Sequence, residues 1–309
     1  MINIKRRTES PQRRLLGALP GRAGRITFYT VALVIFTDLD GALLDGAYSY
    51  RAALPALRRL ARAPVPCVIC SGKTSREIEH YRKKLHNRDP FCSENGGGIF
   101  LPKRYFASPS GGGLSQLSRG DGPYEVVRLG VPYARLREAL VLLRAKGFDV
   151  TGFGDMSAEE IAARTGLPLE EAVMAKEREF DEPFLMEGAR ADRAEIARAI
   201  EEMGLAVTEG RLFFHLTGGN NKGKAVAAVK RLFKEASTGG NIVFAGLGDG
   251  LDDLSMLESV DLPIVVRRPD GTYDPRLQGR GFVETEGVGP AGWNRAVLSL
   301  LNRESSWRP

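Results

Sequence analysis

The chain has 309 residues, enough for one large or two moderate domains, and 43% of them are hydrophobic, which permits a substantial core. The formal charge of +6 arises within residues 1–30, where seven basic residues accompany one acid, and the rest of the chain carries 37 charges of each sign. A body without net positive charge argues against phosphate-backbone binding, so we expect no nucleic-acid partner.

Residues 1–30 contain proline and glycine and lack apolar periodicity, which predicts a disordered, dispensable extension. The apolar stretch 26–36 is too short for a membrane span, and no small-residue cleavage site follows it. We therefore expect a cytoplasmic protein with no membrane partner. Cys67, Cys70 and Cys92 fit this expectation as reduced core residues, because three thiols cannot complete a four-thiolate zinc site.

An apolar run at residues 34–36 predicts a buried strand that leads directly into Asp38 and Asp40. Ligands of parallel sheets collect at the carboxyl ends of the strands. Two adjacent carboxylates at such an end repel each other and lose solvation, and a hard divalent cation is the usual compensation. For an isolated Asp-x-Asp, a solvated turn is the alternative interpretation.

A second apolar run, residues 65–70, ends at Ser71 and Gly72. Thr74 and Glu77 have the spacing of a capping box, which predicts that a helix follows. A hydroxyl and backbone N–H groups at a strand end near a helix start can bind an anion. Ordinary turn chemistry explains Ser-Gly equally well when it is taken alone.

About 150 residues separate Ser71 from Lys222, far more than a short connection needs, and they predict a second domain. Its expected strands cover residues 124–129 and 148–151, and its expected helices cover residues 133–146, 157–164, from 168 onward and 190–203. Residues 108–122 are rich in serine and glycine, which indicates a mobile hinge or loop tip.

Lys222 and Lys224 open a predicted helix over residues 225–233, where one of them could face a cleft and the other water. An apolar strand at residues 242–247 then leads to three further carboxylates, Asp249, Asp252 and Asp253. Trp293 is expected to pack a C-terminal helix.

Taken in this order, the four motifs resemble those of the haloacid dehalogenase (HAD) superfamily. The resemblance implies an α/β fold with a Rossmann-like three-layer core, residues 31–107 and 209–309, and an inserted α/β cap, residues 108–208. It assigns Asp38 as nucleophile and Asp40 as general acid/base, which indicates a phosphatase or mutase rather than an ATPase. It further implies phosphate binding by Ser71 and Lys222, and a Mg²⁺ site made by Asp38, Asp40, Asp249 and Asp253 with help from Asp252.

Five segments resemble the mannosyl-3-phosphoglycerate phosphatases. Two lie in the expected cap, residues 152–157 and 175–184, and three lie outside it, residues 90–98, 215–219 and 289–294. This implies hydrolysis of mannosyl-3-phosphoglycerate to mannosylglycerate, a compatible solute, through an aspartyl-phosphate. The alternatives are a phosphatase of glucosyl-3-phosphoglycerate or sucrose phosphate, and a non-catalytic binding protein of the same fold.

Such a substrate, a phosphorylated glycoside, needs partners for a carboxylate and a sugar as well as for the phosphate. Arg178 and Lys176 are candidates for binding the carboxylate. Arg178 is the better of the two, because a guanidinium group can donate two parallel hydrogen bonds to a carboxylate. The candidates for the sugar hydroxyls are Glu94, Asn95, Asp155 and Glu182. The alternative for residues 176–182 is a helix surface with charge pairs, and for Asn95 a tight hairpin turn. His215 follows two phenylalanines and is expected to be a core histidine.

Overall fold

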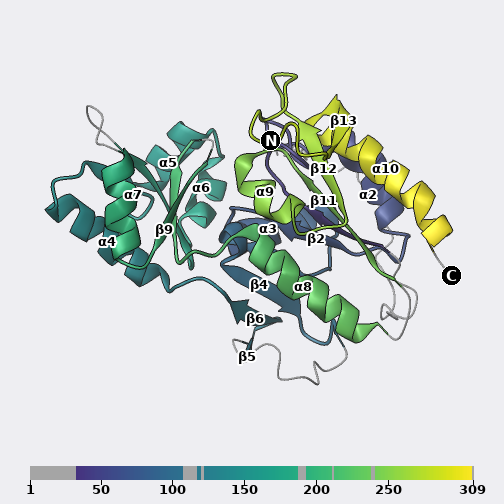
Figure 1. Ribbon diagram of the computed structural model, residues 1–309, viewed down its shortest axis with the longest axis horizontal. Helices are drawn as coiled ribbons and strands as arrows, with labels where there is room; N and C mark the ends of the chain where they lie inside the picture. The colour runs from purple at the N-terminus through teal and green to yellow at the C-terminus, as the bar shows by residue number, and fades with distance from the viewer. Residues whose placement is uncertain are drawn as a thin grey trace, which may run out of the picture.

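The structure is a computed structural model, and it describes residues 33–106, 117–119, 122–186, 193–210, 212–237 and 241–307, with the side chains of 117–119 and 304–307 left aside. The predictions for residues 1–30 and for most of the stretch 108–122 lie outside these ranges. Two bodies are visible in Figure 1, a core built on a nine-stranded sheet and a cap built on a four-stranded sheet.

The core sheet has the strand order β13-β12-β11-β1-β2-β3-β4-β6-β5. Its parallel part consists of β1 (Leu33–Thr37), β2 (Cys67–Cys70), β3 (Phe91–Ser93), β11 (Val243–Gly248), β12 (Leu262–Arg267) and β13 (Val283–Val288). The antiparallel extension consists of β4 (Gly98–Pro102), β5 (Leu117–Arg119) and β6 (Tyr124–Arg128). β1 lies between β11 and β2, and all five of its residues are buried.

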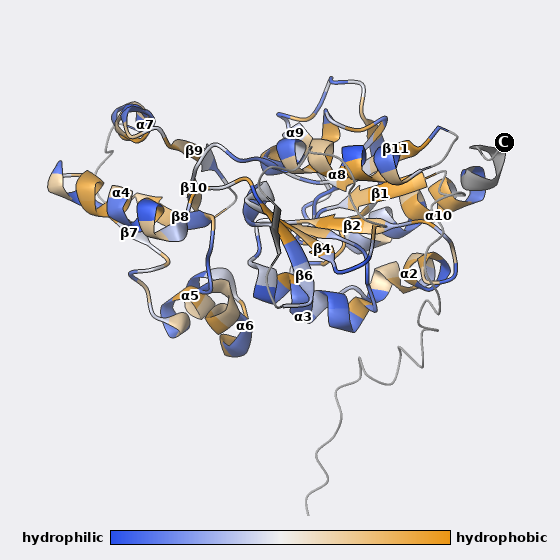
Figure 2. Cartoon of the chain, turned by 90° about the horizontal axis from the view of Figure 1, so that it is seen from below, coloured by the Kyte–Doolittle hydropathy of each residue, from blue (hydrophilic) through white to orange (hydrophobic). Residues whose placement is uncertain are grey.

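Helices cover both faces of this sheet, as the alternation of side chains along β1 requires. Leu33 and Ile35 share one apolar cluster with α2 (Leu54–Leu60), α3 (Ser75–Leu85) and α10 (Gly289–Trp307). Val34 and Phe36 share another with α8 (Lys222–Ala236) and α9 (Leu254–Leu257). Figure 2 shows the hydrophobic residues concentrated on the strands between these layers. The three-layer core expected from the sequence is therefore present.

The cap sheet has the order β7-β8-β10-β9, with all neighbours antiparallel. Its strands are β7 (Val150–Gly152), β8 (Asp181–Met186), β9 (Ala206–Glu209) and β10 (Phe214–Thr217). The helices α4 (Tyr133–Ala145) and α7 (Arg193–Glu202) pack in one apolar cluster, and α5 (Ala158–Thr165) and α6 (Leu169–Ala175) in another.

The cap differs at both ends from the predicted range 108–208. β6, expected in the cap, pairs with β4 and extends the core sheet, while β10, assigned to the core, pairs with β8 and β9 in the cap sheet. Both are short strands whose residue pattern predicts extended structure but not the partner strand. The chain crosses into the cap near Val131 and returns near Gly218, and these two residues are in contact.

Local predictions agree with the structure where they rest on short-range chemistry. Both hydrogen bonds of the capping box form at Thr74 with Glu77 and at Ser157 with Glu160. Cys67 and Cys70 belong to apolar clusters on opposite faces of the sheet and are free and buried, as expected. Among the described helices, none is long and apolar enough to cross a membrane.

Candidate active site

A cavity of about 470 Å³ lies between the carboxyl ends of the core strands and the cap. The core contributes Asp38, Asp40 and Ser71 to its wall, and the cap contributes Arg178 and His215. Because residues of both bodies line it, the cavity has the placement expected of a ligand site in an open α/β sheet.

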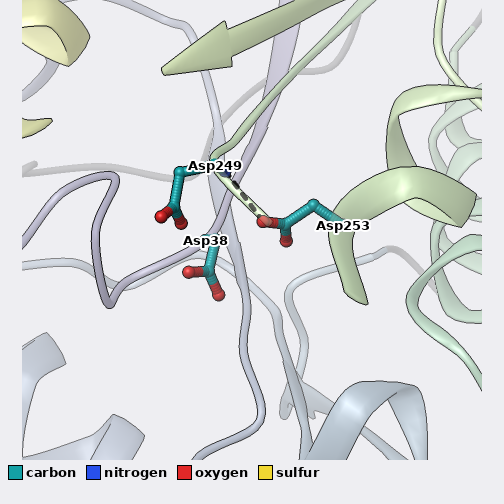
Figure 3. A group of neighbouring side chains, drawn as sticks. All are labelled: Asp38, Asp249 and Asp253. Carbon is teal, nitrogen blue, oxygen red and sulfur yellow. Dashed lines mark hydrogen bonds between the residues drawn. The ribbon is translucent and has the colours of Figure 1, made fainter. Parts of the chain in front are cut away.

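Three carboxylates meet at the core end of the cavity. β1 and β11 pair in parallel up to Thr37 and Leu247, so Asp38 and Asp249 emerge side by side at the sheet edge. One oxygen each of Asp38, Asp249 and Asp253 lies within 4.8 Å of the others, and the three side chains converge in Figure 3. The backbone N–H of Asp249 donates to Asp253 Oδ2 over 2.9 Å, which fixes the loop between them.

Glycine at position 41 is required by this convergence. Its φ is +84°, and a Cβ there would lie 2.4 Å from Asp249 Oδ2. Any side chain would therefore displace one of the three carboxylates, so the glycine of Asp-x-Asp-Gly allows the loop after β1 to approach the end of β11.

The electrostatics of the three carboxylates favour a compensating cation. Burial raises the pKa of Asp38 well above its usual value, against the opposing charge of Lys222. Burial and the neighbouring carboxylates raise the pKa of Asp249 to about 8, and burial raises that of Asp253 to about 6. Carboxylate oxygens are the ligands that hard divalent cations prefer, so this donor set fits such an ion.

Lys222 is the ammonium group at the centre of this cluster. Its side chain is 0% exposed, and Nζ donates to Asp38 Oδ1 (2.9 Å), Asp252 Oδ2 (2.7 Å) and Asp253 Oδ1 (2.6 Å). Asn221 caps α8 by accepting from the N–H of Lys224, whose own side chain is exposed. Of the two lysines, Lys222 is therefore the one that is buried against the carboxylates of the site.

Asp40 occupies a different environment two residues from Asp38. Its side chain is 40% exposed in the cavity, and Oδ2 lies 3.1 Å from Lys73 Nζ. Lys73 is itself buried, and Asp40 and Glu77 raise its pKa although burial opposes them. Ser71, at the end of β2, accepts from the N–H of Lys73. Sequence reasoning missed Lys73, because only the packing of α3 brings it to Asp40.

On the cap side, Asp181 is a buried carboxylate held by three partners. His215 Nδ1 and Asn95 Nδ2 lie 2.8 Å and 3.0 Å from Asp181 Oδ2, and Arg178 Nη2 lies 3.4 Å from the same oxygen. His215 is 19% exposed and lines the cavity, so the expectation of a core histidine is wrong. No local signal identified it, because Asp181 lies on the neighbouring strand.

Arg178 and Glu94 connect the cap to the core. Arg178 Nη1 donates to the carbonyl of Gly72 in the core (3.0 Å), and Nε to the carbonyl of Asp181 in the cap (3.1 Å). Glu94 accepts from the backbone N–H groups of residues 179–181. Burial raises the pKa of Glu94 to about 7, opposed by the charge of Arg178. The helix-surface alternative for residues 176–182 is wrong, because α6 ends at Ala175.

The remaining sequence candidates divide into two groups. Asn95 lines the cavity in the turn between β3 and β4, with φ of +52°, so both interpretations of this residue hold together. The other three are engaged within the cap: Lys176 with the carbonyl of Met156, Glu182 with Tyr133 and Arg137, and Asp155 with Arg137 and Arg144. None of those three is among the residues that line the cavity.

The chain is similar to known proteins over most of its length. Residues 35–108 match the model of the haloacid dehalogenase-like hydrolases. The chain is 42% identical to a glucosyl-3-phosphoglycerate/mannosyl-3-phosphoglycerate phosphatase of Methanococcoides burtonii, over 88% of this chain and 98% of that protein. It is 38% identical to a protein of the same name from Persephonella marina (87% and 97%), and 34% identical to a mannosyl-3-phosphoglycerate phosphatase of Pyrococcus horikoshii (75% and 90%).

The fold has counterparts among solved structures at low sequence identity. A HAD superfamily phosphatase from Bacteroides thetaiotaomicron has a TM-score of 0.58 at 17% identity, covering 93% of this chain and 99% of that one. A HAD subclass IIB sugar phosphatase has a TM-score of 0.56 at 14% identity, covering 87% and 98%. These likenesses support the core-and-cap architecture.

The contacts of Arg178 predict a large loss of stability in the Arg178→Ala variant. The substitution leaves Asp181 and Glu94 buried without this cation, and removing one partner of a buried ion pair costs about 3–5 kcal/mol. Urea unfolding followed by circular dichroism measures the free energy of unfolding. Arg231→Ala is the matched control, because this arginine is exposed on α8, and a loss of the same size there would contradict the prediction.

Proposed function

Since this chain belongs to the family of glucosyl-3-phosphoglycerate/mannosyl-3-phosphoglycerate phosphatases, within the haloacid dehalogenase-like hydrolases, we propose that it is a phosphoric monoester hydrolase acting on mannosyl-3-phosphoglycerate. The products are mannosylglycerate and phosphate. Glucosyl-3-phosphoglycerate is the second candidate substrate, because the relatives at 42% and 38% identity carry both substrates in their names.

One observation carries this proposal: two aspartates at the end of β1 lie in opposite environments on the same cavity. Asp38 is buried against Lys222 and the acidic cluster, which suits a nucleophile held in one position. Asp40 is part exposed and reaches into the cavity beside Lys73, which suits a group that exchanges protons with substrate and water.

We assign the metal site to Asp38, Asp249 and Asp253, with Mg²⁺ as the expected ion and Asp252 beside it. The family resemblance adds the backbone carbonyl of Asp40 as a ligand. When bound, Mg²⁺ neutralises negative charge on the phosphoryl oxygens and lets Asp38 stay ionised. Asp252 contacts Lys222, so it adds negative charge next to the three ligands.

The reaction then follows from the positions of the side chains. A carboxylate oxygen of Asp38 attacks phosphorus and forms an aspartyl-phosphate, while Asp40 gives a proton to the leaving alkoxide of the glycerate. Asp40 next accepts a proton from the water that attacks the phosphorus of the aspartyl-phosphate, which releases phosphate and restores Asp38. Ser71 and Lys222 are assigned to the phosphoryl oxygens, where a hydroxyl orients and an ammonium neutralises them.

The cap has two parts in this proposal. Its cavity-lining residues, among them Arg178 and His215, form part of the cavity wall, and a cap over the site limits the access of water to the phosphoryl centre. Lys176, Glu182 and Asp155 support the cap from within, so any effect of these residues on the substrate passes through the position of the cap. Three free, buried cysteines support placing the enzyme in the cytoplasm.

A phosphate-release panel tests the substrate assignment. With purified protein and Mg²⁺, mannosyl-3-phosphoglycerate and glucosyl-3-phosphoglycerate are expected to show a much higher kcat/KM than sucrose phosphate. Asp38→Asn serves as the blank for contaminating phosphatases. Turnover of sucrose phosphate without turnover of either glycosyl-3-phosphoglycerate would refute the proposed function.

The metal assignment predicts that Mg²⁺ stabilises the folded protein. Binding to the native state alone adds about 2.7 kcal/mol at a hundredfold excess over Kd, which raises Tm. Asp249→Asn removes one of the three carboxylates and is expected to abolish most of this shift. Asp270→Asn, which alters an exposed carboxylate outside the cavity, is the control and keeps the full shift. An undiminished shift in Asp249→Asn contradicts the assignment.

The two aspartates are expected to differ when each is replaced by asparagine. Asp38→Asn removes the nucleophile, so turnover falls to background with every substrate. Asp40→Asn loses the proton shuttle, which contributes roughly 10²–10⁴-fold for an alkoxide leaving group. The loss is smaller in the first step with nitrophenyl phosphate, since nitrophenolate needs little protonation, and a burst of nitrophenol precedes slow turnover. Stopped-flow absorbance measures the burst, and metal-dependent activity in Asp38→Asn would refute the mechanism.

A further inference from the structure

Two arginines of the core line the cavity on the side of the metal-site carboxylates. Arg268 follows β12 directly, and Arg276 lies in the loop between β12 and β13. Neither belongs to one of the four motifs identified in the sequence, and the steps proposed above do not use them. Their guanidinium groups are held together by one carboxylate, that of Asp274.

Asp274 binds both guanidinium groups. Its side chain is 1% exposed, and Oδ2 accepts from Arg268 Nη2 (2.5 Å) and Arg276 Nη2 (2.9 Å). Oδ1 accepts from Arg276 Nε (3.0 Å) and from the N–H of the same residue (2.9 Å). Arg268 Nε also donates to the backbone carbonyl of Asp249 (3.2 Å). The pair is therefore anchored to the end of β11, where the metal-site carboxylates begin.

Within 4.0 Å this pair faces fewer carboxylates per cation than Lys73 and Lys222 do, while Glu209 and Asp252 act on Arg276 from farther away. Lys73 faces the two carboxylates of Asp40 and Glu77, and Lys222 faces three. Arg268 and Arg276 share Asp274, and the only other carboxylate oxygen within 4.0 Å of either group in the described part of the chain is Asp249 Oδ2, at 4.0 Å from Arg268 Nε. A metal ion bound to Asp249 would compete with Arg268 for this carboxylate.

Donors are also left over on the pair. In the described ranges, Nη1 of neither arginine donates a hydrogen bond, and the Arg276 side chain is 47% exposed. Arg178, the sequence candidate for the substrate carboxylate, is different. Its Nε and Nη1 donate to backbone carbonyls, and its Nη2 faces Asp181. The guanidinium nitrogens of Arg178 are thus all engaged by other groups of the protein.

We propose that Arg268 and Arg276 form the subsite for the carboxylate of the glyceryl phosphate ester, a proposal that rests on the function proposed above. In 3-phosphoglycerate esters two carbons and one oxygen separate the carboxylate from phosphorus, so the carboxylate must bind close to the phosphoryl site. A guanidinium pair next to Asp249 meets that requirement. Guanidinium groups held in a fixed orientation bind a planar carboxylate through charge-assisted hydrogen bonds.

The test compares two inhibitors that differ only in the carboxylate. 3-Phosphoglycerate and glycerol 3-phosphate are used against hydrolysis of nitrophenyl phosphate by the full chain with Mg²⁺. In the wild type, 3-phosphoglycerate is expected to bind more tightly. Arg276→Gln is expected to raise its inhibition constant roughly 10- to 100-fold, as for loss of a hydrogen bond to a charged group, with little change for glycerol 3-phosphate. Arg276→Lys gives an intermediate value.

Two further variants make the result decisive. Arg231→Gln, at an arginine with the same 47% exposed fraction on α8, is expected to behave as the wild type. Three outcomes would overturn the proposed subsite. Arg276→Gln could weaken the binding of both inhibitors equally, or it could leave both inhibition constants unchanged. In the third, only Arg178→Lys removes the preference for 3-phosphoglycerate over glycerol 3-phosphate. These outcomes are separate from the glycoside panel, because a chain that hydrolyses neither glycosyl-3-phosphoglycerate can still show or lack the carboxylate preference among the small inhibitors.

Discussion

The architecture depends on one electrostatic constraint, the meeting of four carboxylates around one buried ammonium group. Asp38, Asp252 and Asp253 all accept from Lys222, and Asp249 lies beside them. Such a cluster is stable only if its members are fixed and the negative charge is matched. The sheet holds these side chains in place, because β1 and β11 pair in register up to Thr37 and Leu247. In addition, Trp293 Nε1 donates to Thr37 Oγ1, one residue before Asp38. The apolar layers therefore serve to hold charges at a defined spacing.

The chemistry of the core could be predicted from the sequence because each part is local. A buried strand followed by carboxylates predicts its own position at the sheet edge, and a capping box predicts its own helix, as at Thr74. Lys73 and His215 were beyond such reasoning, because the first meets Asp40 only through the placement of α3 and the second meets Asp181 only across two strands. The partners of β6 and β10 were missed for the same reason, since strand pairing is decided by tertiary packing.

Several polar contacts join the cap to the core. Tyr81 Oη donates to Glu171 of the cap, Thr74 Oγ1 donates to the carbonyl of Met174, and Glu94 accepts from three successive cap N–H groups. Hydrogen bonds of this kind have strict geometry and exchange with water at modest net free energy. Such contacts therefore make the position of the cap on the core specific.

The two crossings between core and cap lie against each other, since the space beside Gly218 is filled by Val131. An inserted domain joined at one place can vary in sequence and orientation without changing the register of β1 against β11. The consequence is modularity: a change of residues within the insertion can alter the cap wall of the cavity while β1 and β11 keep their register and the acidic cluster keeps its spacing.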